Sequence, residues 1–222
     1  MTAAQHALAE GNPGLAAQRL IYARDADPTN PAVLRLLTVA FWQSGNLPAA
    51  GRAVRDWGRA ETDRPTAERY ASRIYEDMGA IDLAVEAAER VAERVPEDAS
   101  AWARVGRLRL RLLQRNAAIN ALERARDLEP SVEIMLDLAL AHHLAGDVGA
   151  EVSAAESATM IAPDSSQAWS AFAHALARTD RLQECIAACE QALRLGDDAE
   201  VQELLERTKA ALPHELSSRT AA

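Results

Sequence analysis

The hydrophobic positions of this chain recur at helical spacing, and a short arginine-rich stretch shows the pattern most clearly. In residues 104–115, RVGRLRLRLLQR, two stripes have the spacing i, i+3, i+7, which places each on one face of a helix. The apolar stripe is Val105, Leu108 and Leu112. The basic stripe is Arg104, Arg107 and Arg111. The local Arg–Leu alternation is therefore a helical pattern seen over a short window, and no alternating run of β-branched residues predicts a strand elsewhere.

Turn signals divide the chain at a period of about 34 residues. Pro28 and Pro96 are 68 residues apart, twice 34, and Pro130 and Pro163 follow after 34 and 33 more. Between the prolines come GNP at 11–13, GNL at 45–47, GAI at 79–81, GDV at 146–148 and TDR at 179–181, while LQRN at 113–116 stands where one marker is lost. A glycine in such a turn supplies a left-handed conformation that ends a helix. The sequence thus predicts repeated helix–turn–helix units at 1–30, 31–64, 65–98, 99–131, 132–165 and 166–199, the first with a shortened first helix.

Two of these units carry large and small residues at matching positions. Residues 99–131 have Trp102, Val105, Gly106, Ala118, Leu122, Ala125 and Pro130. Residues 166–199 have Trp169, Phe172, Ala173, Cys185, Cys189 and Ala192. This pattern resembles the tetratricopeptide repeat family, whose unit is a 34-residue helix–turn–helix. Departures from it are Trp57 at a small-residue position, Arg109 at a tyrosine position and Glu151 at an alanine position.

The resemblance implies an all-α fold: a right-handed superhelical α-solenoid of antiparallel helix pairs. It covers a single solenoid at residues 1–212, in which 200–212 form a capping helix, and 213–222 are expected to be a flexible tail. In such a solenoid each unit buries its apolar face against its neighbours. We therefore expect Trp102 and Trp169 in the core.

Charge and composition exclude several classes of function. The net charge is −9, from 24 basic and 33 acidic residues, which argues against nucleic-acid binding because that needs a basic footprint. No apolar run reaches 18 residues, so no membrane span is expected, and the N-terminus does not read as a signal peptide. Two cysteines four residues apart on one helix do not suit a disulfide, which favours a cytoplasmic location.

The candidates for chemistry are few. None of the five histidines lies in a metal or catalytic motif, and adjacent His142 and His143 point about 100° apart on a helix. Cys185 and Cys189 share a helix face and suit a redox pair or half a metal site, but they occupy packing positions, so core packing is the favoured interpretation. We expect no enzyme activity, no cofactor and no metal.

The resemblance implies that the first helix of each unit lines a concave groove. The residues that it assigns to a partner-binding site there are Arg35, Trp42, Arg69, Arg73, Arg104, Arg107, Arg111, His143, His174 and Arg178. A central basic strip suggests an acidic, extended partner. The family's clamp for C-terminal carboxylates also uses asparagines, which are missing here. The alternative is that the arginines pair internally with Glu76, Asp77, Glu133 and Asp137.

Two functions follow from this pattern. The first is a non-enzymatic scaffold or adaptor that binds a protein or peptide segment, acidic or extended, in its groove. The alternative is a structural component that self-associates or joins a larger assembly through the ends of the solenoid.

Overall fold

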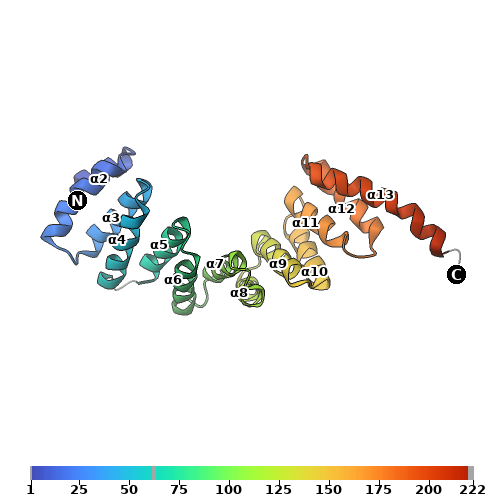
Figure 1. Cartoon of the computed structure of the whole chain (residues 1–222), viewed down its shortest axis with the longest axis horizontal. Helices are drawn as coiled ribbons and strands as arrows, with labels where there is room; N and C mark the ends of the chain where they lie inside the picture. The colour runs from blue at the N-terminus through green and yellow to red at the C-terminus, as the bar shows by residue number, and fades with distance from the viewer. Residues whose placement is uncertain (1, 62–63, 220–222) are drawn as a thin grey trace. The chain divides into compact units, whose positions relative to one another are not determined.

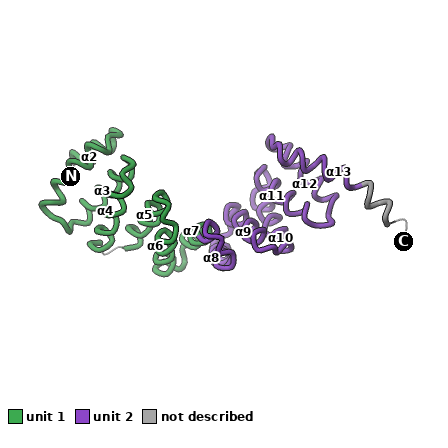
Figure 2. The backbone as a smooth tube through the Cα atoms, viewed as in Figure 1, with its two compact units in different colours: residues 1–108 green, residues 109–222 purple. Residues whose placement is uncertain are grey.

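Helices account for all the regular structure in the computed structural model, which describes the backbone of residues 2–61 and 64–219 and the side chains of residues 3–61 and 64–212. Within these residues there are thirteen helices and no strand (Figure 1). The predicted fold class is confirmed: the chain is all-α and built from antiparallel helix pairs of the solenoid type. It forms two compact units, residues 1–108 and residues 109–222 (Figure 2).

Unit 1 contains three helix pairs and most of a further helix. Its helices are α1 (Thr2–Ala9), α2 (Pro13–Ala26), α3 (Pro31–Gln43), α4 (Leu47–Ala60), α5 (Arg64–Asp77), α6 (Ile81–Arg94) and α7 (Ala99–Arg111), whose last three residues belong to unit 2. Partners within a pair pack together, as α3 does with α4, and α2 and α4 also pack on the first helix of the next pair. Each amphipathic face is thereby covered by its neighbours along the chain.

Unit 2 continues the same arrangement. Its helices are α8 (Arg115–Leu128), α9 (Val132–Ala145), α10 (Val148–Ile161), α11 (Ser166–Leu176), α12 (Leu182–Leu195) and α13 (Ala199–Arg219). The pairs are α9 with α10 and α11 with α12, and α13 packs on α12 as a final helix. The single solenoid over 1–212 and the flexibility of 213–222 stay predictions.

The turns within the pairs repeat one backbone design. Gly11, Gly45, Gly79 and Gly146 all have φ between 73° and 79°, as the sequence predicted. At Gly45 the glycine N–H donates to the Trp42 carbonyl (3.0 Å), and the next N–H, of Asn46, donates to the Phe41 carbonyl (2.9 Å). This is the Schellman pattern, which satisfies the last carbonyls of the first helix. The side chain of Asn46 then caps α4 by accepting from the Ala49 N–H.

The core consists mainly of alanine, leucine and valine, with one large exception. Trp57 is only 1% exposed and is the largest fully buried side chain among the described residues. The expectation for Trp102 and Trp169 is wrong in part: both are half-buried, and their indole N–H groups donate to the carbonyls of Pro96 (3.0 Å) and Pro163 (2.9 Å). The reason is that an indole combines an apolar ring with a donor that needs a partner, so these rings sit at the rim of the core.

Candidate functional site

Four of the predicted arginines line one pocket in unit 1. The pocket has a volume of about 150 Å³ and lies among α5, α6 and α7. Its polar wall is formed by Arg69, Arg73, Arg104, Arg107, Ser72 and Ser100. Ala88 and Val91 of α6 supply an apolar wall. We call this the arginine pocket.

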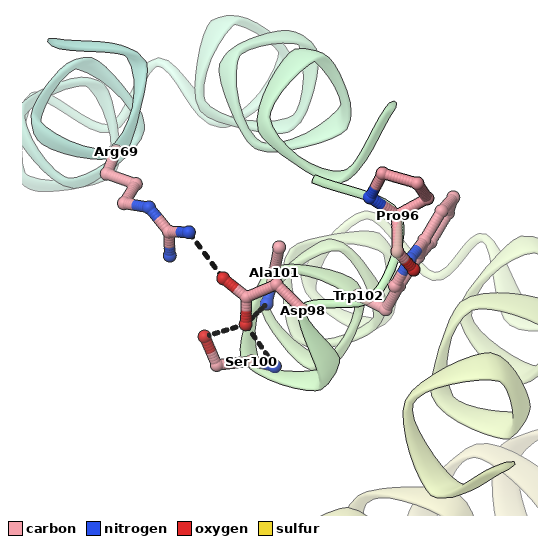
Figure 3. A network of polar contacts seen from close by, with 6 residues as sticks. All are labelled: Arg69, Pro96, Asp98, Ser100, Ala101 and Trp102. Atoms are coloured by element: carbon pink, nitrogen blue, oxygen red, sulfur yellow. Dashed lines mark hydrogen bonds and ion pairs between the residues drawn. The ribbon is translucent and has the colours of Figure 1, made fainter. Parts of the chain in front are cut away.

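Arg69 is held in this pocket by Asp98, the residue just before α7. Its Nη2 donates to Oδ2 of Asp98, while Oδ1 of Asp98 accepts from the Ser100 N–H (2.9 Å), the Ser100 hydroxyl (2.6 Å) and the Ala101 N–H (Figure 3). Burial alone would raise the pKa of Asp98, but the hydrogen bonds from Ser100 and Arg69 and the charge of Arg69 outweigh it, so the pKa is lowered. Asp98 therefore stays ionised, caps α7 and fixes Arg69.

Arg104 is ordered by two residues of α5. Its Nε donates to the Ser72 hydroxyl (2.8 Å), and its Nη2 donates to Oε2 of Glu76 (2.8 Å). Ser72 is fully buried, so this hydroxyl has a fixed place in the wall. The internal pairing expected as an alternative thus exists for Arg104 and Glu76, whereas the carboxylate that orders Arg69, Asp98, was not foreseen.

Arg73 differs from these two arginines. It is exposed, it lines the same pocket, and no residue in the described part of the chain pairs with it. Arg107 is also exposed and adds a fourth guanidinium group. Because Arg69 and Arg104 already hold one carboxylate each, the charge of Arg73 adds a net positive contribution to the pocket.

A second pocket lies between α3 and α5. It is open, has a volume of about 290 Å³, and is lined by Val39, Trp42, Gln43 and Tyr70. The Trp42 indole N–H donates to Oδ2 of Asp77 (2.6 Å), and the Trp42 and Tyr70 rings meet edge to face at 5.9 Å. We call it the aromatic pocket.

Two predicted site residues of unit 2 meet at a buried carboxylate. Glu151 of α10 is 5% exposed, and it accepts from Arg178, which follows α11, while Nδ1 of His143 in α9 lies 2.9 Å from Oε1. The Arg178 Nη1 is also 2.8 Å from His143 Nδ1. Arg178 therefore neutralises an internal charge, and His143 adds a polar contact to both residues.

The remaining predicted residues lie apart from both pockets. Arg35 on α3 and His174 on α11 are exposed, and the described residues offer neither of them a partner. Arg111 is exposed at the end of α7 and does not line the arginine pocket. The binding role of all ten residues stays a prediction.

Three residues that shape these sites were not among the predicted site residues. Asp98 could have been found from its place just before a helical segment, where an acid suits the N-cap. Glu151 was visible as a carboxylate at a position expected to be small. Ser72 gave no signal, since its role depends on Arg104 from the next unit.

The cysteines occupy the core, as the favoured interpretation held. Cys185 and Cys189 are both fully buried, and the Cys185 thiol donates to the Ala173 carbonyl (3.4 Å). The hydrogen bond to Cys185 and burial raise the pKa of the Cys189 thiol. Within the described residues there is no cluster of three or more histidine, cysteine or acidic side chains placed to hold a metal ion. None of the described helices is long and apolar enough to cross a membrane.

Comparison with known proteins agrees with this architecture. Among solved structures, a fragment of MamA from Desulfovibrio magneticus RS-1 is 19% identical and has a TM-score of 0.68 over 74% of this chain and 94% of its own. A tetratricopeptide repeat protein from Parabacteroides merdae is 17% identical, with a TM-score of 0.72 over 95% and 84%. YrrB, described as a TPR protein with an unusual peptide-binding site, is 15% identical, with a TM-score of 0.70 over 87% and 99%. No curated protein sequence matches the chain.

The family follows from the sequence as well as the fold. Two models of the tetratricopeptide repeat match residues 7–74 and 105–165, together more than half of the chain. Both regions contain the helix pairs and left-handed turns described above. The chain therefore belongs to the tetratricopeptide repeat family, whose proteins are typically scaffolds for protein interactions.

Proposed function

We propose that this protein is a non-enzymatic interaction scaffold that holds an acidic segment of a partner protein against α5 and α7 of unit 1. The observation that carries the proposal is the arginine pocket, and within it Arg73, which is exposed and has no pairing partner among the described residues. Arginine binds carboxylates through two parallel hydrogen bonds, which suits a segment of aspartate or glutamate.

Internal ion pairs do not remove this capacity. Asp98 engages Arg69 through one oxygen and Glu76 engages Arg104 through one nitrogen, so each guanidinium group keeps further N–H donors. Ser100 adds a hydroxyl on the same wall. A partner carboxylate can therefore bridge Arg73 and the free edges of the ordered arginines.

The test reverses the charge of Arg73 alone. Arg73→Glu leaves both internal ion pairs in place, and Arg52→Glu makes the same charge change on an exposed arginine of α4 that is neither in the pocket nor among the predicted site residues. With a fluorescein-labelled oligoglutamate peptide, we expect Arg73→Glu to weaken binding at least about tenfold, equal to 1.4 kcal/mol. Arg52→Glu should change it little.

Equal weakening by the two variants would mean that the peptide responds to overall charge and would contradict a defined pocket. Failure of the wild-type protein to bind the peptide at any accessible concentration would contradict the proposal as a whole. Circular dichroism of both variants confirms that the helices are intact.

A further inference from the structure

We propose that unit 1 recognises two side chains of its ligand at a fixed spacing: an apolar side chain in the aromatic pocket and a carboxylate in the arginine pocket, about three residues apart. This inference rests on the proposed function and makes it more specific. It follows from the contribution of α5 to both pockets, because Tyr70 lines the first and Arg69 and Arg73 line the second.

Contacts hold both rings of the aromatic pocket in place. The Trp42 indole N–H donates to Asp77, and the Trp42 and Tyr70 rings pack edge to face. Tyr70 is supported in turn by the buried Trp57, with ring centroids 5.4 Å apart. The two rings therefore present fixed apolar surfaces to an open volume, a feature that favours anchoring by one large side chain.

The lining of the aromatic pocket favours an apolar occupant. Val39 and the rings of Trp42 and Tyr70 form most of its wall, and Gln43 is its one polar residue. The two charged groups nearest the rings, Asp77 and Arg73, have opposite signs, so they give the pocket no net charge to attract an ion. An aliphatic or aromatic side chain that enters the pocket removes apolar surface of both molecules from water.

The spacing follows from helix packing. The pockets occupy successive gaps, α3 to α5 and α5 to α7, and packed helices are separated by about 8–10 Å. A polyproline II segment rises about 3.1 Å per residue with three residues per turn, so residues i and i+3 share a face about 9 Å apart. The ligand pattern is thus an apolar residue, two spacer residues and an acidic residue, in either chain direction.

The test uses synthetic peptides in which one Leu and one Glu are separated by zero to six residues of a Gly/Ser host. Two control peptides replace Leu by Ser or Glu by Gln. Affinity is measured by titration with ¹⁵N-labelled protein, following the indole N–H of Trp42, which donates to Asp77, and that of Trp169 in unit 2 as a reference. We expect the highest affinity at two spacer residues, about tenfold above the Leu→Ser peptide.

Variants assign the two contacts separately, and their affinities are followed at the backbone amides of α3 and α5. Trp42→Ala and Val39→Asn should each remove the advantage of the leucine peptide while leaving the Leu→Ser peptide unaffected, and Trp169→Ala should do neither. Val39→Asn keeps both rings and the net charge, so it guards against loss of packing in Trp42→Ala.

The outcomes separate this inference from the proposed function. If peptides bind through Glu but ignore the leucine and its spacing, or if Val39→Asn leaves the leucine advantage intact, the two-pocket inference is overturned and acidic-segment binding stands. If removing Glu has no effect on binding, the proposed function itself is overturned.

Discussion

At the scale of single residues, two aspartates each cap a helix and also bind a side chain of an earlier helix. Asp98 gives one oxygen to the first turn of α7 and the other to Arg69 of α5. Asp198 repeats the device at α13, where it caps the helix through the Val201 N–H and accepts from the Ser170 hydroxyl of α11. In each case a helix start is tied to the first helix of the preceding pair.

The titration of Asp98 tests this arrangement. We expect NMR to give a pKa below the ordinary value of 3.8, and Arg69→Gln to raise it. Because the folded-state pKa is lowered, Asp98 stabilises the fold at pH values above its unfolded pKa, and this contribution is lost as the pH falls through the folded-state pKa. Asp98→Asn keeps a capping side chain and should cost about 1 kcal/mol at neutral pH, and Asp98→Ala about 1 kcal/mol more, by urea unfolding. A normal pKa would show that Arg69 does not pair with Asp98 in solution.

The buried Glu151 predicts an asymmetry between its partners. Arg178→Ala leaves a carboxylate that is only 6% exposed with one donor fewer, and should lower the free energy of unfolding by about 3 kcal/mol. Glu151→Ala leaves Arg178 and His143, which reach water with 34% and 51% of their side chains exposed, so it should cost less than about 1 kcal/mol. Urea unfolding at neutral pH compares the two. The opposite order would mean that Glu151 contributes by packing.

At the scale of helices and turns, the turn between α7 and α8 keeps the repeated backbone design without a glycine. Leu113 has a φ of 55°, and its N–H and that of Gln114 bond to the carbonyls of Leu110 and Arg109, as glycine and the next residue do in the other turns. A non-glycine residue is strained there by about 1–2 kcal/mol. The side chain is 59% exposed, so little packing offsets this strain.

Adding a glycine to one turn and removing a glycine from another measures this strain. Leu113→Gly should stabilise the protein by about 0.5–1 kcal/mol, reduced from the full strain by the added freedom of glycine in the unfolded chain. Gly45→Ala, at a φ of 74° with open space around the site, should destabilise by a similar amount. Thermal unfolding of both variants provides the measurement. If both substitutions shift stability in the same direction, backbone conformation does not govern these turns.

The helices and turns were the part of the structure that the sequence predicted best. Periodic apolar positions and the glycine markers locate the ends of most helices, because both signals are local. The arginine pocket was predicted only as a list of residues. Which carboxylate each arginine meets depends on side chains about 30 residues away, as with Arg69 and Asp98, and no local pattern encodes that choice.

At the scale of the whole molecule, the net charge of the chain and the charge of the arginine pocket have opposite signs. The chain carries a net charge of −9, while the arginine pocket gathers four guanidinium groups. An acidic ligand is therefore repelled at long range and attracted at contact. The two effects have different ranges and respond differently to salt.

Kinetics at two salt concentrations separate these effects. Between about 0.01 M and 0.1 M salt, where the Debye length falls from about 30 Å to 10 Å, the association rate constant of the oligoglutamate peptide should stay level or rise. The dissociation rate constant should rise, because contacts in the pocket weaken. Stopped-flow fluorescence measures both. An association rate that falls with salt would show instead that long-range attraction dominates.

The ordering of Arg69 and Arg104 by internal partners has a consequence for the thermodynamics of binding. A free arginine side chain loses up to about 2 kcal/mol of conformational entropy when it is immobilised. Asp98 holds Arg69, and Ser72 and Glu76 hold Arg104, before any ligand arrives, so much of that loss belongs to folding. An anionic ligand then meets guanidinium groups that are already oriented. The internal ion pairs thus preorganise the pocket. Ligands of different affinity should therefore differ mainly in their enthalpy of binding and little in the side-chain entropy that the arginines lose.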